Sequence, residues 1–95
     1  MKQPVVYMMA NKKNGVIYVG VSSWLAKRAY EHRNSVVKGF TEEYRCHLLV
    51  YYELHQTMEL AITREKQLKA GPRRKKIELI ESINPRWEDL YKNII

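Results

Sequence analysis

The stretch Gly15–His32, GVIYVGVSSWLAKRAYEH, predicts the centre of the fold. It begins with the β-branched and aromatic residues of a strand, passes Gly20 and two serines, and continues with the composition of a helix. The preceding residues 4–10, PVVYMMA, are apolar on both parities and predict a buried strand. Because Asn14-Gly15 suits a hairpin turn, the two strands should pair antiparallel, and a helix should follow over residues 24–36.

The rest of the chain predicts one more strand and further helices. Residues 47–54, HLLVYYEL, are apolar on both faces and predict a strand at the centre of a small sheet. Thr57 is placed to cap a second helix, which Gly71-Pro72 ends, and a third helix and a short terminal one follow. The expected fold is therefore α+β, with a three-stranded antiparallel sheet flanked by three to four helices.

Each helix should bury one face. In the helix after Gly20 the buried residues are expected to be Trp24, Leu25, Ala29 and Tyr30. In the second helix the apolar stripe is expected to be Met58, Ala61, Ile62 and Leu68. Glu65 falls on that stripe, where a carboxylate is costly unless it is paired or binds a metal. The third helix should bury Ile77, Ile80 and Ile83.

Size and charge narrow the classes of function. Ninety-five residues predict one domain, and a net charge of +7 favours a polyanionic partner such as nucleic acid. The single cysteine, Cys46, excludes an intrachain disulfide and a cysteine-rich zinc site, and is expected to be buried. No apolar run suits a membrane span or a secretory signal, so we expect a cytoplasmic protein with no membrane partner.

Five polar side chains stand where core residues are expected: Tyr7, Tyr18, Arg28, His32 and Glu65. Together they could hydrolyse a phosphodiester, since a carboxylate can hold a divalent metal, an arginine can grip phosphate, and a phenol or imidazole can take a proton from water. Each of these residues also has a purely structural interpretation. The tyrosines could serve packing, Arg28 could be solvated or paired with Glu65, and His32 could be a surface or a satisfied core residue.

The order of several short motifs resembles one nuclease superfamily. Val5-Val6-Tyr7, then ten residues, then Tyr18-Val19-Gly20 is similar to the GIY-YIG signature. LAKRAYEH at 25–32 resembles that family's first helix, and AITREKQLK at 61–69 its second helix, with the glutamate at Glu65. VYYE at 50–53 and NPRWEDLY at 84–91 are similar to the small, single-domain bacterial branch.

The resemblance implies a role for each candidate. Tyr7 and Tyr18 would lie close together and one would act as the general base, with Tyr7 slightly favoured. Arg28 would contact the scissile phosphate, and His32 would assist proton transfer or hold the leaving group. Glu65 would bind one Mg²⁺ or Mn²⁺ ion. Gly20 is expected to mark a bulge or a close approach, and a side chain there would crowd the space between Tyr18 and Arg28.

The sequence also departs from the family pattern. The first motif is VVY instead of GIY, and Ile77 stands where many active relatives carry an asparagine. Since this branch has no appended DNA-binding domain, phosphate contacts are expected from Lys12, Lys13, Lys69, Arg73, Arg74, Lys75 and Lys76. The implied function is a metal-dependent DNA endonuclease. A catalytically weak or inactive nucleic-acid-binding module is the alternative, and a protein partner that supplies targeting or uses the basic face is a further one.

Overall fold

The computed structural model describes residues 2–34 and 44–95. Its elements, in chain order, are β1 (Val5–Ala10), β2 (Ile17–Ser22), α1 (Leu25–Arg33), β3 (Leu48–Leu54), α3 (Met58–Ala70), α4 (Arg73–Ile83) and the 3-10 helix η1 (Leu90–Asn93). The three strands form one antiparallel sheet, so the predicted α+β class and its three-stranded sheet are confirmed. None of the helices within the described ranges is long and apolar enough to cross a membrane.

The strand at the centre of the sheet is β1. The order is β2-β1-β3, and all six residues of β1 are buried. The prediction that residues 47–54 form the central strand is therefore wrong. An apolar pattern on both faces reports that layers cover the strand on both sides, and it does not report whether a strand has one neighbour or two. Among the described strands, β3 pairs with β1 alone, and Leu54 at its end is 62% exposed.

The hairpin between β1 and β2 turns at the predicted residues. Asn14 takes the positive φ, at 58°, and the Asn11 side chain accepts a hydrogen bond from the Val16 N–H at 2.8 Å. Arg73, the first residue of α4, donates to the carbonyl oxygens of Asn14 and Gly15 at 2.9 and 2.6 Å. This turn is therefore tied to the start of α4, far along the chain.

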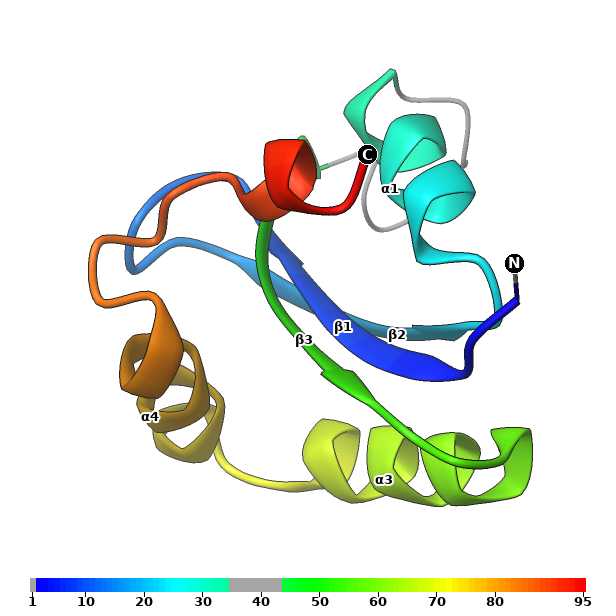
Figure 1. The fold of residues 1–95 in the computed structure, drawn as a ribbon. Helices are drawn as coiled ribbons and strands as arrows, with labels where there is room; N and C mark the ends of the chain where they lie inside the picture. Colours follow the sequence, from blue (N-terminus) through cyan, green and yellow to red (C-terminus); the bar gives the residue numbers. More distant parts are fainter. Residues whose placement is uncertain (1, 35–43) are drawn as a thin grey trace.

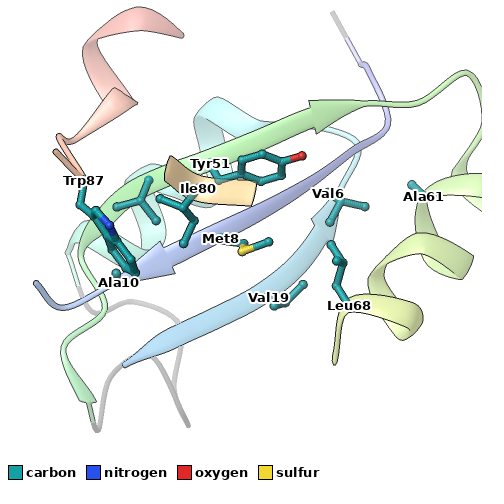
Figure 2. Packing of buried hydrophobic residues seen from close by; sticks show 10 residues of the cluster. Val6, Met8, Ala10, Val19, Tyr51, Ala61, Leu68, Ile80 and Trp87 are labelled. Carbon is teal, nitrogen blue, oxygen red and sulfur yellow. The ribbon is translucent and has the colours of Figure 1, made fainter. Parts of the chain in front are cut away.

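Helices cover both faces of the sheet, with α1 and η1 on one side and α3 and α4 on the other (Figure 1). On the α3 side, Ala61 and Leu68 pack toward Val6 and Val19 (Figure 2). On the α1 side the core is Val5, Tyr7, Met9, Leu25, Ala29, Cys46 and Leu49. Cys46 is buried, as predicted, and burial raises the pKa of its thiol to about 11.

The first helix is shorter than predicted and buries fewer aromatic residues. It begins at Leu25 and ends at Arg33, with Trp24 and Asn34 as its flanking residues. Residues 35 and 36 of the predicted range, like most of the loop predicted after it, lie outside the described residues. Neither predicted serine caps it, although Ser22 Oγ accepts a bond from the Trp24 N–H at 3.0 Å. Trp24 and Tyr30 are 50% and 56% exposed, so their predicted burial is wrong.

The later helices keep part of their predicted stripes. Thr57 Oγ1 caps α3 by accepting a bond from the Leu60 N–H at 3.2 Å. Ala61 and Leu68 are buried, as is Ile80 of α4. Ile62 and Ile83, predicted to be buried, are exposed, because each helix packs on the sheet through a stripe narrower than its apolar pattern.

Candidate active site at the edge of strand β2

Tyr7 lies at the centre of the candidate site. It comes from the middle of β1 on the face that α1 covers, and its side chain is 1% exposed. Its hydroxyl oxygen lies 2.9 Å from His32 Nε2 on α1. His32 is itself 1% exposed, and together with Leu25 and Ala29 it forms the buried face of the helix. The apolar spacing of α1 therefore turns His32 toward the sheet.

Gly20 makes room for the Tyr7 ring. The two residues are paired across β1 and β2, and a Cβ atom on Gly20 would lie 2.5 Å from Tyr7 Cζ and Oη and 2.9 Å from Tyr18 Cε2. The expected close approach is thus made by Tyr7. The expected alternative of a bulge at Gly20 is wrong, since the irregular pairing lies between Met8 and Met9, where β1 meets β3. The prediction placed the crowding between Tyr18 and Arg28; the nearest atoms that a side chain at position 20 would meet belong to Tyr7 and Tyr18.

Three rings from three elements converge. The ring centres are 6.3 Å apart for Tyr7 and Tyr18, 5.7 Å for Tyr7 and His32, and 5.3 Å for Tyr18 and His32. Tyr18 is half-buried, whereas the other two are enclosed. The structure therefore brings together two phenols and an imidazole, with Tyr18 as the member most open to solvent.

Burial keeps the enclosed pair uncharged at neutral pH. It is the largest cause that raises the pKa of Tyr7 far above its ordinary value, with the neighbouring Tyr18 next, while Arg28 acts in the opposite direction. Burial followed by the positive charge of Arg28 lowers the pKa of His32 from 6.5 to about 4. The bond between Tyr7 and His32 thus joins a neutral phenol and a neutral imidazole.

Arg28 lies one turn before His32 on α1, at the partly exposed side of the cluster. Its side chain is 43% exposed, and its nearest carboxylate is Glu31, at 3.6 Å. The structural alternative in which Arg28 pairs with Glu65 is not observed. Because its charge acts on the pKa values of both Tyr7 and His32, the guanidinium is close enough to act on charge that develops at the cluster.

Glu65 approaches from the opposite layer. α3 packs on the sheet face opposite to Tyr7 and Tyr18, yet the Glu65 carboxylate contributes to the raised pKa of Tyr7. Its Oε2 lies 3.1 Å from Lys69 Nζ, and that ammonium is 5.9 Å from the centre of the Tyr18 ring. Since β2 is an edge strand, these two side chains reach the tyrosines at that edge. The Glu65 side chain is 14% exposed, consistent with its predicted place on the inner stripe.

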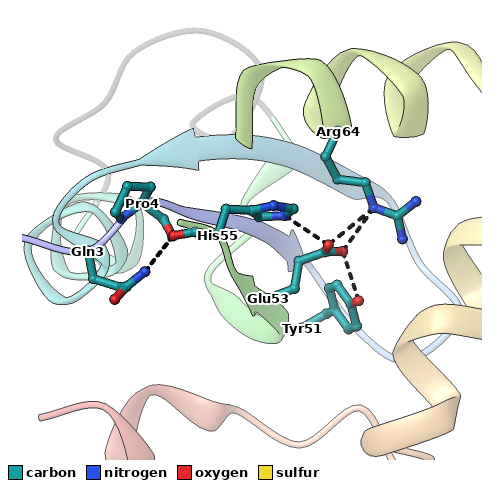
Figure 3. Close-up of polar contacts among 6 residues, drawn as sticks. All are labelled: Gln3, Pro4, Tyr51, Glu53, His55 and Arg64. Carbon is teal, nitrogen blue, oxygen red and sulfur yellow. Dashed lines mark hydrogen bonds and ion pairs between the residues drawn. The ribbon is translucent and has the colours of Figure 1, made fainter. Parts of the chain in front are cut away.

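A polar anchor that the sequence did not reveal fixes α3 beside the site. Glu53 on β3 accepts hydrogen bonds from Arg64 Nε at 3.2 Å and from the Tyr51 hydroxyl at 2.9 Å (Figure 3). His55 Nε2 lies 3.0 Å from the same carboxylate. Arg64 directly precedes Glu65, so this anchor also positions the candidate metal ligand. The alternation of Tyr51 and Glu53 on β3 with His55 directly after it was the one sequence signal for this anchor.

The donor set suits a hard divalent cation. No group of three or more His, Cys, Asp or Glu side chains gathers within residues 2–34 and 44–95, so Glu65 stands as a single carboxylate whose charge acts on Tyr7. Mg²⁺ prefers oxygen ligands and often keeps several of its waters while binding one or two carboxylates. One protein carboxylate beside a substrate phosphate therefore fits such an ion.

The predicted phosphate-binding residues fall into three groups. Arg73 and Lys76 bond backbone carbonyls, and Arg74 lies 3.8 Å from Glu78. Lys12 and Lys13 are exposed on the hairpin turn, which the contact with Arg73 brings next to the start of α4, and Lys75 is exposed there too. Lys69 lies apart from these, at the candidate site.

The chain belongs to the GIY-YIG family. The model of the GIY-YIG catalytic domain matches residues 3–78, a range that contains both tyrosines, Arg28, His32 and Glu65. This family is part of a nuclease superfamily, and the resemblance on which the expectations rested is confirmed.

Among individual proteins, the chain is similar to a UPF0213 protein of Staphylococcus saprophyticus subsp. saprophyticus. The two are 35% identical over 68 residues, which cover 72% of this chain and 83% of the relative. This small relative agrees with the predicted bacterial branch. No solved structure matches the chain.

Proposed function

We propose that this protein is an endonuclease that hydrolyses phosphodiester bonds in DNA with the help of one Mg²⁺ or Mn²⁺ ion. The observation that carries the proposal is the meeting of Tyr7, Tyr18 and His32 within 6.3 Å, with Arg28 and Glu65 close enough to act on Tyr7. A packing role alone gives no reason to gather these five polar groups at one edge of the sheet.

Tyr18 is our candidate for the proton acceptor. The sequence slightly favoured Tyr7, but Tyr7 is 1% exposed, bonded to His32, and held protonated by a raised pKa. Tyr18 is half-buried, and the Lys69 ammonium lies 5.9 Å from its ring centre. A phenolate at Tyr18 can take the proton of an attacking water from this position.

Tyr7 and His32 would then position Tyr18. Their mutual hydrogen bond and burial fix two of the three rings, and fixed groups lower the cost of reaching the reactive geometry. His32 would influence the reaction through Tyr7, because its Nε2 faces that hydroxyl and the side chain is enclosed. This differs from a direct hold on the leaving group, which its family resemblance also allowed.

Arg28 and Glu65 would act on the phosphate and the metal. The half-exposed guanidinium can donate to two oxygens of the scissile phosphate. Glu65 would hold the divalent ion, with the anchor from Glu53 to Arg64 fixing its helix. When bound, that ion would supply positive charge at the phosphate oxygens. Phosphate contacts farther along the DNA are proposed for the exposed lysines at positions 12, 13 and 75 and for the basic residues at 73, 74 and 76. Lys69, which lies at the candidate site, is proposed to contact a phosphate there.

Plasmid nicking tests this proposal. Supercoiled plasmid would be incubated with wild-type protein in Mg²⁺ or Mn²⁺, and with Glu65→Ala. The matched control is Glu59→Ala, which removes an exposed carboxylate from the first turn of the same helix. We expect wild type and Glu59→Ala to nick the plasmid and Glu65→Ala to lose at least about 100-fold in rate. Equal rates for wild type and Glu65→Ala would refute the metal-binding role.

One observation favours a second candidate function. The Glu65 carboxylate is already paired with Lys69 at 3.1 Å, an arrangement that suits a nucleic-acid-binding module without metal chemistry. Such a module would bind DNA with a strong salt dependence and equal affinity in wild type and Glu65→Ala. It would show no nicking in either metal. Measuring binding and nicking on the same preparations separates the two functions.

A further inference from the structure

Trp24 is an exposed aromatic residue beside the candidate site. It immediately precedes α1, is 50% exposed, and has the Lys27 ammonium 5.6 Å from the centre of its ring. Arg28 of the candidate site is four residues later. Tyr30, on the same helix, is equally exposed at 56% but lines neither of the two pockets that adjoin Trp24.

The first of these pockets is cationic. It has a volume of about 300 Å³ and is lined by Lys2, Lys27, Arg28 and Glu31, with Ser22, Ser23 and Trp24 completing its wall. Three positive side chains thus face one carboxylate, and the carboxylate is the one already paired with Arg28. This balance favours an anionic ligand. Because Arg28 is shared, the pocket is continuous with the proposed scissile phosphate position.

The second pocket also adjoins Trp24, and apolar side chains line it together with the polar residues Gln3 and Ser23. Its volume is about 320 Å³, and its lining includes Val5, Leu25, Tyr52, Leu54 and Ile94. Leu54 is 62% exposed, an uncommon state for a large apolar side chain beside another exposed one. Gln3 lies in this wall, and its N–H donates to Ser23 O at 2.8 Å, which holds the chain before β1 against the turn into α1.

We propose that these two pockets bind one unpaired nucleotide, so that the substrate is DNA with a single-stranded segment next to the cleaved phosphate. Its base stacks on Trp24 over the second pocket, and its phosphate lies among Lys2, Lys27 and Arg28. A base inside a duplex is stacked on its neighbours on both sides and cannot offer a face to a protein aromatic, which is why the nucleotide must be unpaired. The inference rests on the proposed function for the identity of the cleaved bond, but the binding itself does not require cleavage.

A binding experiment without metal tests this site. Wild-type protein in EDTA would be titrated with a single-stranded oligothymidylate of about eight nucleotides while tryptophan emission is recorded. The chain has two tryptophans, and Trp87 is 2% exposed, so quenching by a stacked base reports on Trp24. Anisotropy of the labelled oligonucleotide gives the affinity of each variant.

The variants separate stacking from charge. Trp24→Ala should weaken binding of the single strand by roughly 5- to 100-fold, the range expected for one stacked base. Trp24→Phe should restore most of the affinity, and Tyr30→Ala, the matched control on the same helix, should change it by less than about twofold. An abasic oligonucleotide of equal charge should bind wild type and Trp24→Ala alike.

Several outcomes would overturn the proposal. Unchanged affinity of Trp24→Ala, equal losses for Trp24→Ala and Tyr30→Ala, or equal binding of abasic and normal strands by wild type would each exclude a base-stacking site. Blunt duplex binding as tight as the single strand would exclude the unpaired nucleotide. Binding of the single strand needs no metal. If the protein does not nick plasmid but Trp24→Ala still weakens binding, only the proposed nuclease function is refuted. Nicking that depends on Glu65 without any Trp24 effect removes only this inference.

Discussion

Lowering the pH from 7 to 5 should destabilise the protein through His32. The folded state holds the pKa of this side chain at about 4, against 6.5 for an exposed histidine, because burial and Arg28 disfavour the charged ring. As the pH falls below 6.5, the unfolded chain binds a proton that the folded protein does not. The contribution of His32 to stability is thus complete above pH 6.5 and is lost progressively as the pH falls toward 4.

The size of this effect follows from the shift. Each unit of difference in pKa corresponds to about 1.4 kcal/mol, so at pH 5, about 1.5 units below 6.5, the free energy of unfolding should be lower by about 2 kcal/mol. His32 is 1% exposed, so solvent screening does not reduce this figure much. The hydrogen bond to Tyr7 does not oppose the loss, since a neutral phenol bonds the neutral ring.

Urea unfolding at pH 7 and pH 5 would measure this loss of stability. His32→Gln cannot titrate, so it should lose about 2 kcal/mol less than wild type over this interval, even if it is less stable at both pH values. An NMR titration of the wild-type histidine rings gives a second measurement that needs no variant, and His32 should titrate near pH 4. The same pH dependence in both proteins, or a His32 ring that titrates near 6.5, would refute the reasoning.

Three further substitutions test other contacts. Gly20→Val should destabilise the fold by about 1–3 kcal/mol and abolish nicking by displacing Tyr7. Gly71→Ala, whose Cβ would meet the Gln67 carbonyl oxygen at 3.3 Å, should cost less in a thermal melt than Gly20→Val. Glu53→Gln should lower the free energy of unfolding, measured in urea, by about 1–2 kcal/mol and should slow nicking by loosening α3. If neither the stability nor the nicking rate changed, Glu53 would not anchor α3. Asn84→Ala removes three hydrogen bonds at a side chain that is 5% exposed, and a loss below about 1 kcal/mol would show that these bonds contribute little.

The sequence predicted the elements of the site better than their arrangement. Tyr7 and Tyr18 could be placed on two paired strands because the hairpin turn and the β-branched runs are local signals. His32 could be placed on the same helix as Arg28 because helical composition is also a local signal. The bond between Tyr7 and His32 could not be predicted, since it depends on which face of α1 packs on β1 and how far along the strand.

Predictions that depended on long-range packing were the ones that failed. The apolar pattern of residues 47–54 could not show that β1 lies between the other two strands. The aromatic character of Trp24 suggested burial, but the narrow contact of α1 with the sheet leaves this ring in solvent. The contact of Glu53 with Arg64 could not be predicted, because Arg64 is eleven residues away on another element.

The position of Glu65 on the layer opposite to the tyrosines has a consequence for tuning activity. The carboxylate and the phenols lie on opposite faces of the sheet, and the packing of α3 on β1 and β2, together with the anchor from Glu53 to Arg64, sets their alignment. Leu68 and Val19 lie in that contact, and neither carries a polar atom in its side chain. Under the proposed function, changing the volume of either should shift the helix relative to the strand and alter the turnover rate while both cores stay folded. Under that function, adaptation to a new temperature can proceed through buried aliphatic residues, with every proposed reacting group left unchanged.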